Sequence, residues 1–162
     1  MKLIELFEKK IFSLFEDSEM LTAESEKLLD QRVTDKFITT LKLGQREVGS
    51  FIFTRYAHIE NNKRIVVNNY SSVNSNFRNL GYGKILLLAA IASAAHYHII
   101  FEKDNSGISP TQKSVYESLL RSGYIKQQPA FYDMAGFEHV EWRITDLGLD
   151  FLNHQIGAIK FL

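Results

Sequence analysis

The sequence contains no cysteine among its 162 residues. Without a thiol the chain forms no disulfide and offers neither a thiolate ligand for zinc nor a cysteine nucleophile. The absence of a disulfide framework favours a cytoplasmic location. Proline is nearly absent too, with two residues, while 45% of residues are hydrophobic and 23% charged. This composition is typical of a folded globular protein and excludes a disordered or fibrous chain.

Neither sign of charge is in excess, because 19 Lys and Arg residues balance 19 Asp and Glu residues. The chain therefore lacks the global positive field that drives non-specific binding to nucleic acid, which disfavours a nucleic-acid partner but leaves a local basic patch open.

Long apolar runs are missing as well. The longest, Ile85 to Ala95, is too short to cross a bilayer, and the N-terminal segment carries charges every few residues, unlike a signal peptide. The sequence predicts no membrane partner.

The length favours one domain over residues 1–162, in three parts: a helical extension (1–33), a core (35–124) and C-terminal strands with a helix (125–162). Apolar residues at helical spacing predict an amphipathic helix over about the first 16 residues, and a shorter helix follows from Thr22 to Arg32. The apolar stripe of the first helix packs on its own domain, or else contacts a partner or a membrane surface. The free stripe and the sheet edges also permit a homodimer.

Three segments rich in β-branched and aromatic residues, DKFITTLKL, REVGSFIFTRYA and RIVVNNYSSV, follow one another with short polar turns between them. They predict an antiparallel meander. A helix from Lys84 to Ala95 and a buried strand from His96 to Asp104 complete a crossover unit.

Beyond this unit, Ser109 and Pro110 have the form of a helix start, and Gly123 that of a helix end. They predict a helix over Pro110 to Arg121, which two short strands and a closing helix near Asp146 to Asn153 follow. The predicted fold class is α+β, with a mixed, mostly antiparallel central sheet of about six or seven strands flanked by helices.

The glycine-containing segment NSNFRNLGYGK, Asn74 to Lys84, joins the last strand of the meander to the apolar helix. Glycines let another molecule approach the backbone closely. The first turn of a helix presents amide N–H groups without helical partners, at the positive end of the helix dipole. The segment lacks the further glycines and polar residues that define a dinucleotide fingerprint or a P-loop. It therefore predicts an anion site, most simply for a phosphate.

Val73 followed by Arg78, Gly81 and Gly83 resembles the acyl-CoA-binding motif of the GNAT superfamily of N-acetyltransferases, in which R-x-x-G-x-G lies between a strand and a helix. The resemblance covers roughly Phe37 to Tyr124. It implies that acetyl-CoA is the acyl donor, that backbone amides of the loop hold its pyrophosphate, and that its pantetheine arm pairs with the strand ending at Val73. The cofactor-binding residues it implies are Val73, Arg78, Asn79, Leu80, Gly81, Tyr82, Gly83, Lys84 and Asn105.

The resemblance further implies acyl transfer to an amine by direct attack, with Tyr116 in KSVYESLLRSGY as the acid that protonates the thiolate. The segment departs from the family pattern by three extra residues between the tyrosine and the aromatic residue after glycine. Tyr116 is alternatively a core aromatic that packs its helix on the sheet.

No single residue stands out as the general base that takes a proton from the amine. The candidates are His58, Glu60, Asn68 to Tyr70, His96 and His98. His96 and His98 have no third ligand nearby, so no metal is predicted. The acceptor class is open.

The segment EKDNSGISPTQKSVYESLLRSGY is similar to a variant of this pattern in some phage-encoded proteins of the fold, which favours a phage origin.

Two other functions stay open at the level of sequence. One is a GNAT fold that has lost catalysis and serves as a CoA-binding or protein-interaction module. The other is a winged-helix-like nucleic-acid-binding protein, because LLRSGYI, two short strands and WRITDLGLDFL have that order. The second leaves the glycine-containing loop and the meander unexplained.

Overall fold

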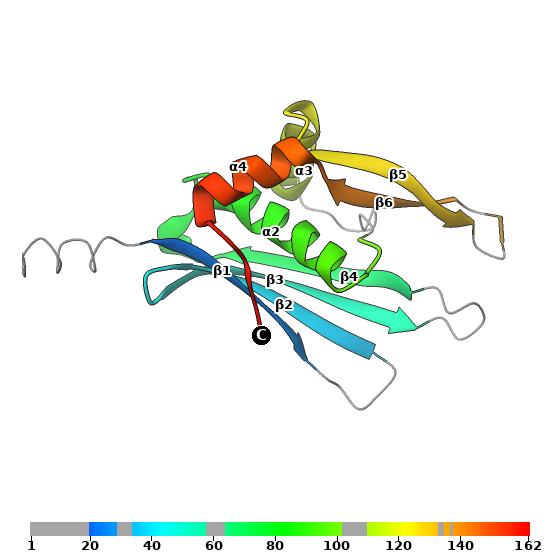
Figure 1. Cartoon of the computed structure of the whole chain (residues 1–162), viewed down its shortest axis with the longest axis horizontal. Coiled ribbons are helices and arrows are strands. Elements are labelled where there is room, and N and C mark those ends of the chain that lie inside the picture. Colours follow the sequence, from blue (N-terminus) through cyan, green and yellow to red (C-terminus); the bar gives the residue numbers. More distant parts are fainter. Residues whose placement is uncertain (1–19, 29–33, 58–63, 102–109, 133–134, 137) are drawn as a thin grey trace, which may run out of the picture.

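The computed structural model describes residues 20–28, 34–57, 64–101, 110–132, 135–136 and 138–162 (Figure 1). These residues form a five-stranded sheet, a two-stranded sheet and three α-helices. The predicted α+β class is confirmed, and the larger sheet is mixed and mostly antiparallel. The predicted helix over the first residues of the chain lies outside the described part.

The larger sheet has the order β4-β3-β2-β1-β7. Its strands are β1 (Leu21–Leu28), β2 (Thr34–Leu43), β3 (Arg46–Ala57), β4 (Arg64–Val73) and β7 (Lys160–Phe161). Strands β1 to β4 pair antiparallel, whereas β7 runs parallel to β1. The predicted meander is thereby confirmed as β2, β3 and β4. Within the described residues, β4 is an edge strand.

The prediction of a helix from Thr22 to Arg32 is wrong over its described part, residues 22–28, which belong to strand β1. This part of the predicted helical extension is therefore a strand. The segment is rich in Leu, Glu and Lys, which favour helices, but pairing with β2 along its whole length overrides this local preference. Ala23 and Ser25 are its buried residues and alternate with partly exposed ones. Because the inward-facing residues are small and one is polar, the apolar alternation of a strand is hard to see in the sequence.

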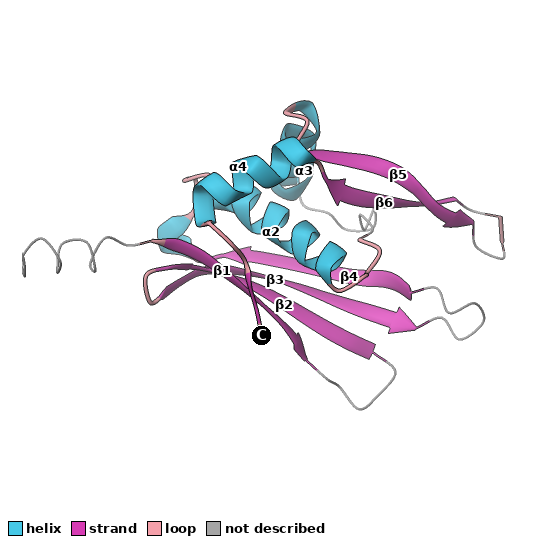
Figure 2. Cartoon of the chain, viewed as in Figure 1, coloured by secondary structure: helices cyan, strands magenta, loops and turns pink. Residues whose placement is uncertain are grey.

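Helix α2 (Tyr82–His96) lies across the larger sheet, and α4 (Asp146–Ile156) lies over α2 (Figure 2). Helix α3 (Pro110–Arg121) ends as predicted, with Gly123 at a positive φ of 73° and the Tyr124 N–H donating to the Leu119 carbonyl at 3.0 Å. All three helices confirm the predicted ones.

The hairpin of β5 (Ile125–Tyr132) and β6 (Glu138–Ile144) forms the second sheet and diverges from β4 (Figure 1). Two strands here are as predicted, but the described strands form two sheets rather than one central sheet.

The predicted strand from His96 to Asp104 is wrong over its described part, residues 96–101. His96 is still helical, and α2 then closes with the Ile99 N–H donating to the Ala94 carbonyl at 2.8 Å and His98 at a φ of 56°. This end motif occupies residues that the sequence predicts as part of the strand. The Trp142 N–H nevertheless donates to the Phe101 carbonyl at 2.8 Å, which ties this irregular segment to β6.

One hydrophobic core joins these elements, with buried members from Ala23 on β1 to Ile156 on α4. Its centre is a group of phenylalanines on β2, β3 and the segment after α2, with ring centroids 5.2–6.1 Å apart. The strands of the meander and the C-terminal helices therefore pack against one another and do not form separate cores.

Candidate functional site

The loop that follows β4 is anchored to the neighbouring strand β3. The Asn74 N–H donates to the Val48 carbonyl at 2.8 Å, and the Asn74 side-chain amide donates to the Glu47 carbonyl at 2.7 Å. A short 3₁₀ turn, η1 (Ser75–Phe77), follows, in which the Phe77 N–H donates to the Asn74 carbonyl at 2.8 Å. The start of the loop is thus fixed relative to the sheet.

Two left-handed residues then turn the chain into α2. Asn79 has a φ of 63°, and Gly81, the N-cap of α2, has a φ of 83°. Asparagine and glycine are the residues that adopt this conformation most readily. The positive φ of residue 81 therefore explains a glycine at this position without any ligand.

The start of α2 has amides that meet the requirements of an anion site. No side chain caps the helix, and its first turn contains no acidic residue. Within the described residues, no backbone turn contact accepts a hydrogen bond from Asn79, Leu80 or Gly81. The amides thus stand at the positive end of the dipole without an acceptor that the described chain provides.

Both loop glycines border open space. A Cβ added to Gly81 would meet nothing within 4 Å, and one added to Gly83 would meet only the Val115 Cγ2, at 4.0 Å. Gly83 has no positive φ that would require glycine. The described chain therefore leaves room above both positions, and it contains no reason for glycine at position 83.

Three basic residues lie in the loop or beside it. Arg78 and Lys84 are exposed, and the Arg78 Nε donates to the Val73 carbonyl at 3.1 Å, which braces the loop against the end of β4. The Arg46 guanidinium lies over the Phe77 ring, 5.4 Å from its centroid, and the Phe77 ring meets Tyr82 edge to face at 6.1 Å. No sequence pattern links Arg46 to the loop, because only the fold brings the start of β3 beside it.

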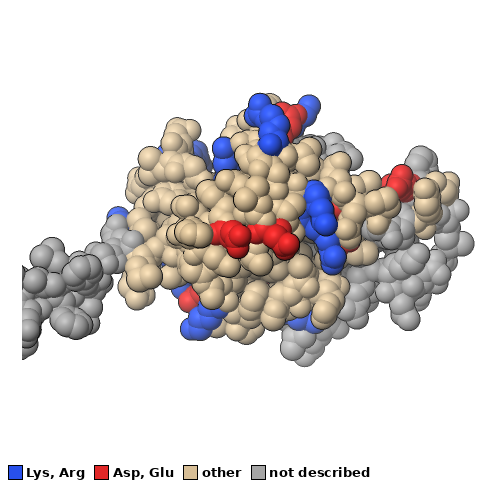
Figure 3. All heavy atoms as spheres, turned by 45° about the horizontal axis from the view of Figure 1, so that its top comes forward, with Lys and Arg blue, Asp and Glu red and all other residues tan. Residues whose placement is uncertain are grey.

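Basic and acidic side chains lie in small separate groups over the face shown in Figure 3. This distribution agrees with the zero net charge of the sequence.

Tyr116, the predicted general acid, lies on α3 one residue after Val115, whose Cγ2 would lie 4.0 Å from a Cβ added to Gly83. The fold therefore brings its helix beside the loop. The side chain is 1% exposed, and its ring packs on Trp142 with centroids 5.4 Å apart. This is the environment of a core aromatic, and the acid role of Tyr116 stays a prediction.

The other predicted site residues lie either outside the described part of the chain or away from the loop. Asn105, His58 and Glu60 lie outside the described residues, and Asn68 to Tyr70 lie on β4. His96 and His98 stand at the far end of α2 from the loop, about 20 Å away at the rise of an α-helix.

Within the described residues, no three His, Asp or Glu side chains come together as metal ligands. None of the described helices is both long and apolar enough to span a membrane.

Comparison with known proteins gives no relative: no family model matches the chain, and neither a curated protein nor a solved structure is significantly similar to it.

Proposed function

We propose that the chain is a GNAT-type N-acyltransferase that binds acetyl-CoA at the loop from Asn74 to Lys84 and transfers the acetyl group to an amine. The loop and the first turn of α2 hold the pyrophosphate with their backbone amides. Arg78 and Lys84 supply positive charge beside it. The motif of Arg78, Gly81 and Gly83, placed between an edge strand and a helix, supports the proposal.

The observation that carries the proposal is Gly83. Glycine in the interior of a helix costs roughly 0.5–1 kcal/mol relative to alanine, because it loses more conformational freedom on folding, and part of this cost applies to Gly83, the second residue of α2. At position 83 no described contact and no unusual backbone angle recovers this cost. A ligand that approaches the backbone too closely for a methyl group explains the glycine.

The edge strand β4 supports the place of the pantetheine arm. Its outer edge pairs with no strand within the described residues, and the β5–β6 hairpin diverges from it (Figure 2). An extended amide-containing chain that adds to such an edge gains main-chain hydrogen bonds. Val73 lies at the end of β4 that meets the loop, so a ligand on the amides continues directly onto this strand.

The reaction needs an unprotonated amine whose nitrogen attacks the thioester carbonyl carbon. The C–N bond forms, the C–S bond breaks, the nitrogen loses a proton and the thiolate gains one. Tyr116 is the proposed proton donor to sulfur.

A second candidate function is a CoA-binding module without turnover. The specific observation in its favour is the burial of Tyr116 against Trp142, which leaves the side chain 1% exposed. A winged-helix function is disfavoured, because α3, α4 and the hairpin bury Tyr116, Leu152 and Trp142 in the same core as the meander.

The test is calorimetric titration with acetyl-CoA of the wild type and two matched variants, Gly81→Ala and Gly136→Ala. Both glycines have nearly the same φ, 83° and 85°, and a Cβ at either would meet nothing within 4 Å. The two variants therefore carry a similar backbone strain, but only Gly81 lies in the loop.

The expected result is one site per chain in the wild type, at least tenfold weaker binding for Gly81→Ala and unchanged affinity for Gly136→Ala. Equal affinities of the two variants, or no binding by the wild type, would contradict the proposal.

A further inference from the structure

Helix α2 has few features that fix its rotation about its own axis. Apolar residues surround it, and it packs on the larger sheet on one side and on α3, α4 and β6 on others. Its buried residues are Ile85, Leu86, Leu87, Leu88, Ala89, Ala90, Ile91, Ser93 and Ala94. Since hydrophobic burial is not directional, a rotated helix still presents apolar side chains to each neighbour.

Ser93 is the polar exception among these buried residues. Its Oγ lies 2.5 Å from the Ser25 Oγ on β1, which lies 2.8 Å from the Thr39 Oγ1 on β2. All three residues are at most 1% exposed. A chain of three hydroxyls therefore connects the helix to two strands inside the core.

The direction of these hydrogen bonds follows from the number of hydrogens. The Ser93 hydroxyl donates to the Ala89 carbonyl at 2.7 Å and so has no hydrogen left for Ser25. Ser25 must then donate to Ser93, and Thr39 must donate to Ser25. Each hydroxyl uses its single hydrogen, and the series ends at a carbonyl of α2.

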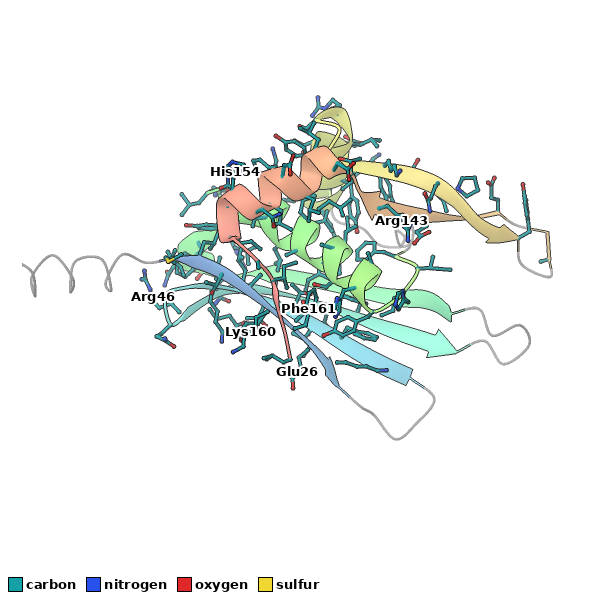
Figure 4. All side chains as sticks on the ribbon, viewed as in Figure 1. Glu26, Arg46, Arg143, His154, Lys160 and Phe161 are labelled. Carbon is teal, nitrogen blue, oxygen red and sulfur yellow. The ribbon has the colours of Figure 1, made fainter. Side chains whose placement is uncertain are left out.

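Ser25 also connects the C-terminal end of α2 to the sheet, through its backbone carbonyl. The Ser25 carbonyl accepts from the Tyr97 hydroxyl at 3.1 Å and from the Leu162 N–H at 2.8 Å. Tyr97 is the C-cap of α2, and Phe161 of β7 stacks on His96 with ring centroids 3.6 Å apart. Figure 4 shows Lys160 and Phe161 on the C-terminal segment that runs beside β1.

Buried hydrogen bonds of this kind distinguish between arrangements more than they add stability. The net contribution of one is about 1 kcal/mol, whereas a buried hydroxyl left without a partner costs about 1–3 kcal/mol. A rotation or slide of α2 would carry Ser93 away from Ser25 and leave one hydroxyl hydrogen of the series without an acceptor in the core, whereas the contact of Ser25 with Thr39 stays because both residues lie on the sheet. Alternative positions of the helix are therefore disfavoured beyond the repacking of the apolar side chains that they would require.

We propose that the Thr39–Ser25–Ser93 hydroxyl series is a positioning device, which sets the rotation and axial position of α2 and thereby places its N-terminal amides against the end of β4. The proposal rests on the proposed function of those amides. Ser93 lies about 15 Å along the helix from Gly83, and a slip of one residue moves the amides by about 1.5 Å and turns them by about 100°. Either change removes the pyrophosphate geometry.

The test compares a triple variant, Ser25→Ala with Thr39→Val and Ser93→Ala, with the single variant Thr39→Ser. The triple variant replaces all three hydroxyls by apolar groups, which leaves no unpaired donor and is expected to keep the melting temperature within a few degrees of the wild type. Thr39→Ser keeps the hydroxyl series. The readouts are acetyl-CoA affinity and, without ligand, the NMR amide resonances of Gly83 and Lys84.

The expected result is an at least tenfold loss of affinity and shifted Gly83 and Lys84 resonances in the triple variant, with both unchanged in Thr39→Ser. Unshifted resonances in a folded triple variant would overturn the positioning role. If the wild type binds no acetyl-CoA, the proposed function fails while the resonances still decide the positioning role. The two failures are thus distinguishable.

Discussion

Two properties of Tyr116 favour different roles. Its helix lies beside the loop, as a proton donor requires, whereas its side chain is buried against Trp142, as in a core aromatic. If the hydroxyl protonates the leaving thiolate, Tyr116→Phe lowers turnover by about 10²-fold or more and leaves acetyl-CoA affinity unchanged. A thiol-reactive dye measures release of CoA with no background from the protein, because the chain has no cysteine. Full turnover in the variant would assign Tyr116 to packing alone.

Gly148, in the first turn of α4, is required by contact rather than by a ligand. A Cβ there would lie 2.1 Å from the Tyr124 carbonyl oxygen and 3.0 Å from the Ile144 Cγ1. Gly148→Ala is therefore expected to destabilise the fold by about 1–3 kcal/mol, as overpacking does. Thermal unfolding checks this, with a loss of roughly 2–4 °C for each kcal/mol. A melting temperature equal to that of the wild type would show that α4 adjusts without cost.

At the level of elements, the middle of β1, where it pairs with β7, carries a charge arrangement with a pH dependence. The Lys42 ammonium of β2 lies 2.9 Å from a Glu24 carboxylate oxygen, and Lys160 of β7 is the register partner of Glu24. The hydrogen bond from Lys42 is the main cause that holds the pKa of Glu24 below its ordinary value of 4.5, and the charges of Lys42 and Lys160 add to it.

A pKa that is lower in the folded than in the unfolded state contributes stability above the unfolded pKa and loses it as the pH falls through the folded one. Glu24→Gln is therefore expected to cost about 0.5 kcal/mol at pH 7, the size for a partly exposed pair, and nothing near pH 2. Urea unfolding at both pH values measures this. A cost that persists at the acid end would assign the effect to packing rather than to charge.

The elements differ in how far the sequence predicts them. The meander and the helices α3 and α4 have strong local patterns and clear ends, such as Gly123, and they were predicted well. For β1 the sequence predicts a helix, because the local preference of the segment is helical and its pairing with β2 is not visible locally. The sequence predicts a strand after α2, because no local pattern shows that His98 adopts a left-handed conformation and that the Ile99 N–H donates back to the Ala94 carbonyl.

In the candidate site, too, some residues are predicted by a local motif and others depend on contacts between distant segments. The loop residues Arg78, Gly81 and Gly83 form one short motif, so the sequence alone identifies them. Arg46 beside Phe77 and the contact of Ser25 with Ser93 depend on pairings between distant segments, which no local pattern encodes. The burial of Tyr116 depends likewise on Trp142 of β6.

For the molecule as a whole, the two sheets and the single core define where the proposed ligand would reach the chain. The edge of β4, the loop and the first turn of α2 follow one another directly, while the diverging hairpin leaves this edge without a strand partner in the described chain (Figure 1). The balanced charge of the whole chain favours a ligand held by local amides over one attracted by a global field.

The most direct test of acetyl-CoA binding at the loop is to measure the thermal stability and the acetyl-CoA affinity of Gly83→Ala on the same preparation. Alanine is the better helix residue, and its Cβ would meet only the Val115 side chain at 4.0 Å. We predict an equal or higher melting temperature without ligand, together with at least tenfold weaker binding of acetyl-CoA. An unchanged affinity would contradict the proposal, because a glycine that neither the fold nor the ligand needs would then carry no information about function.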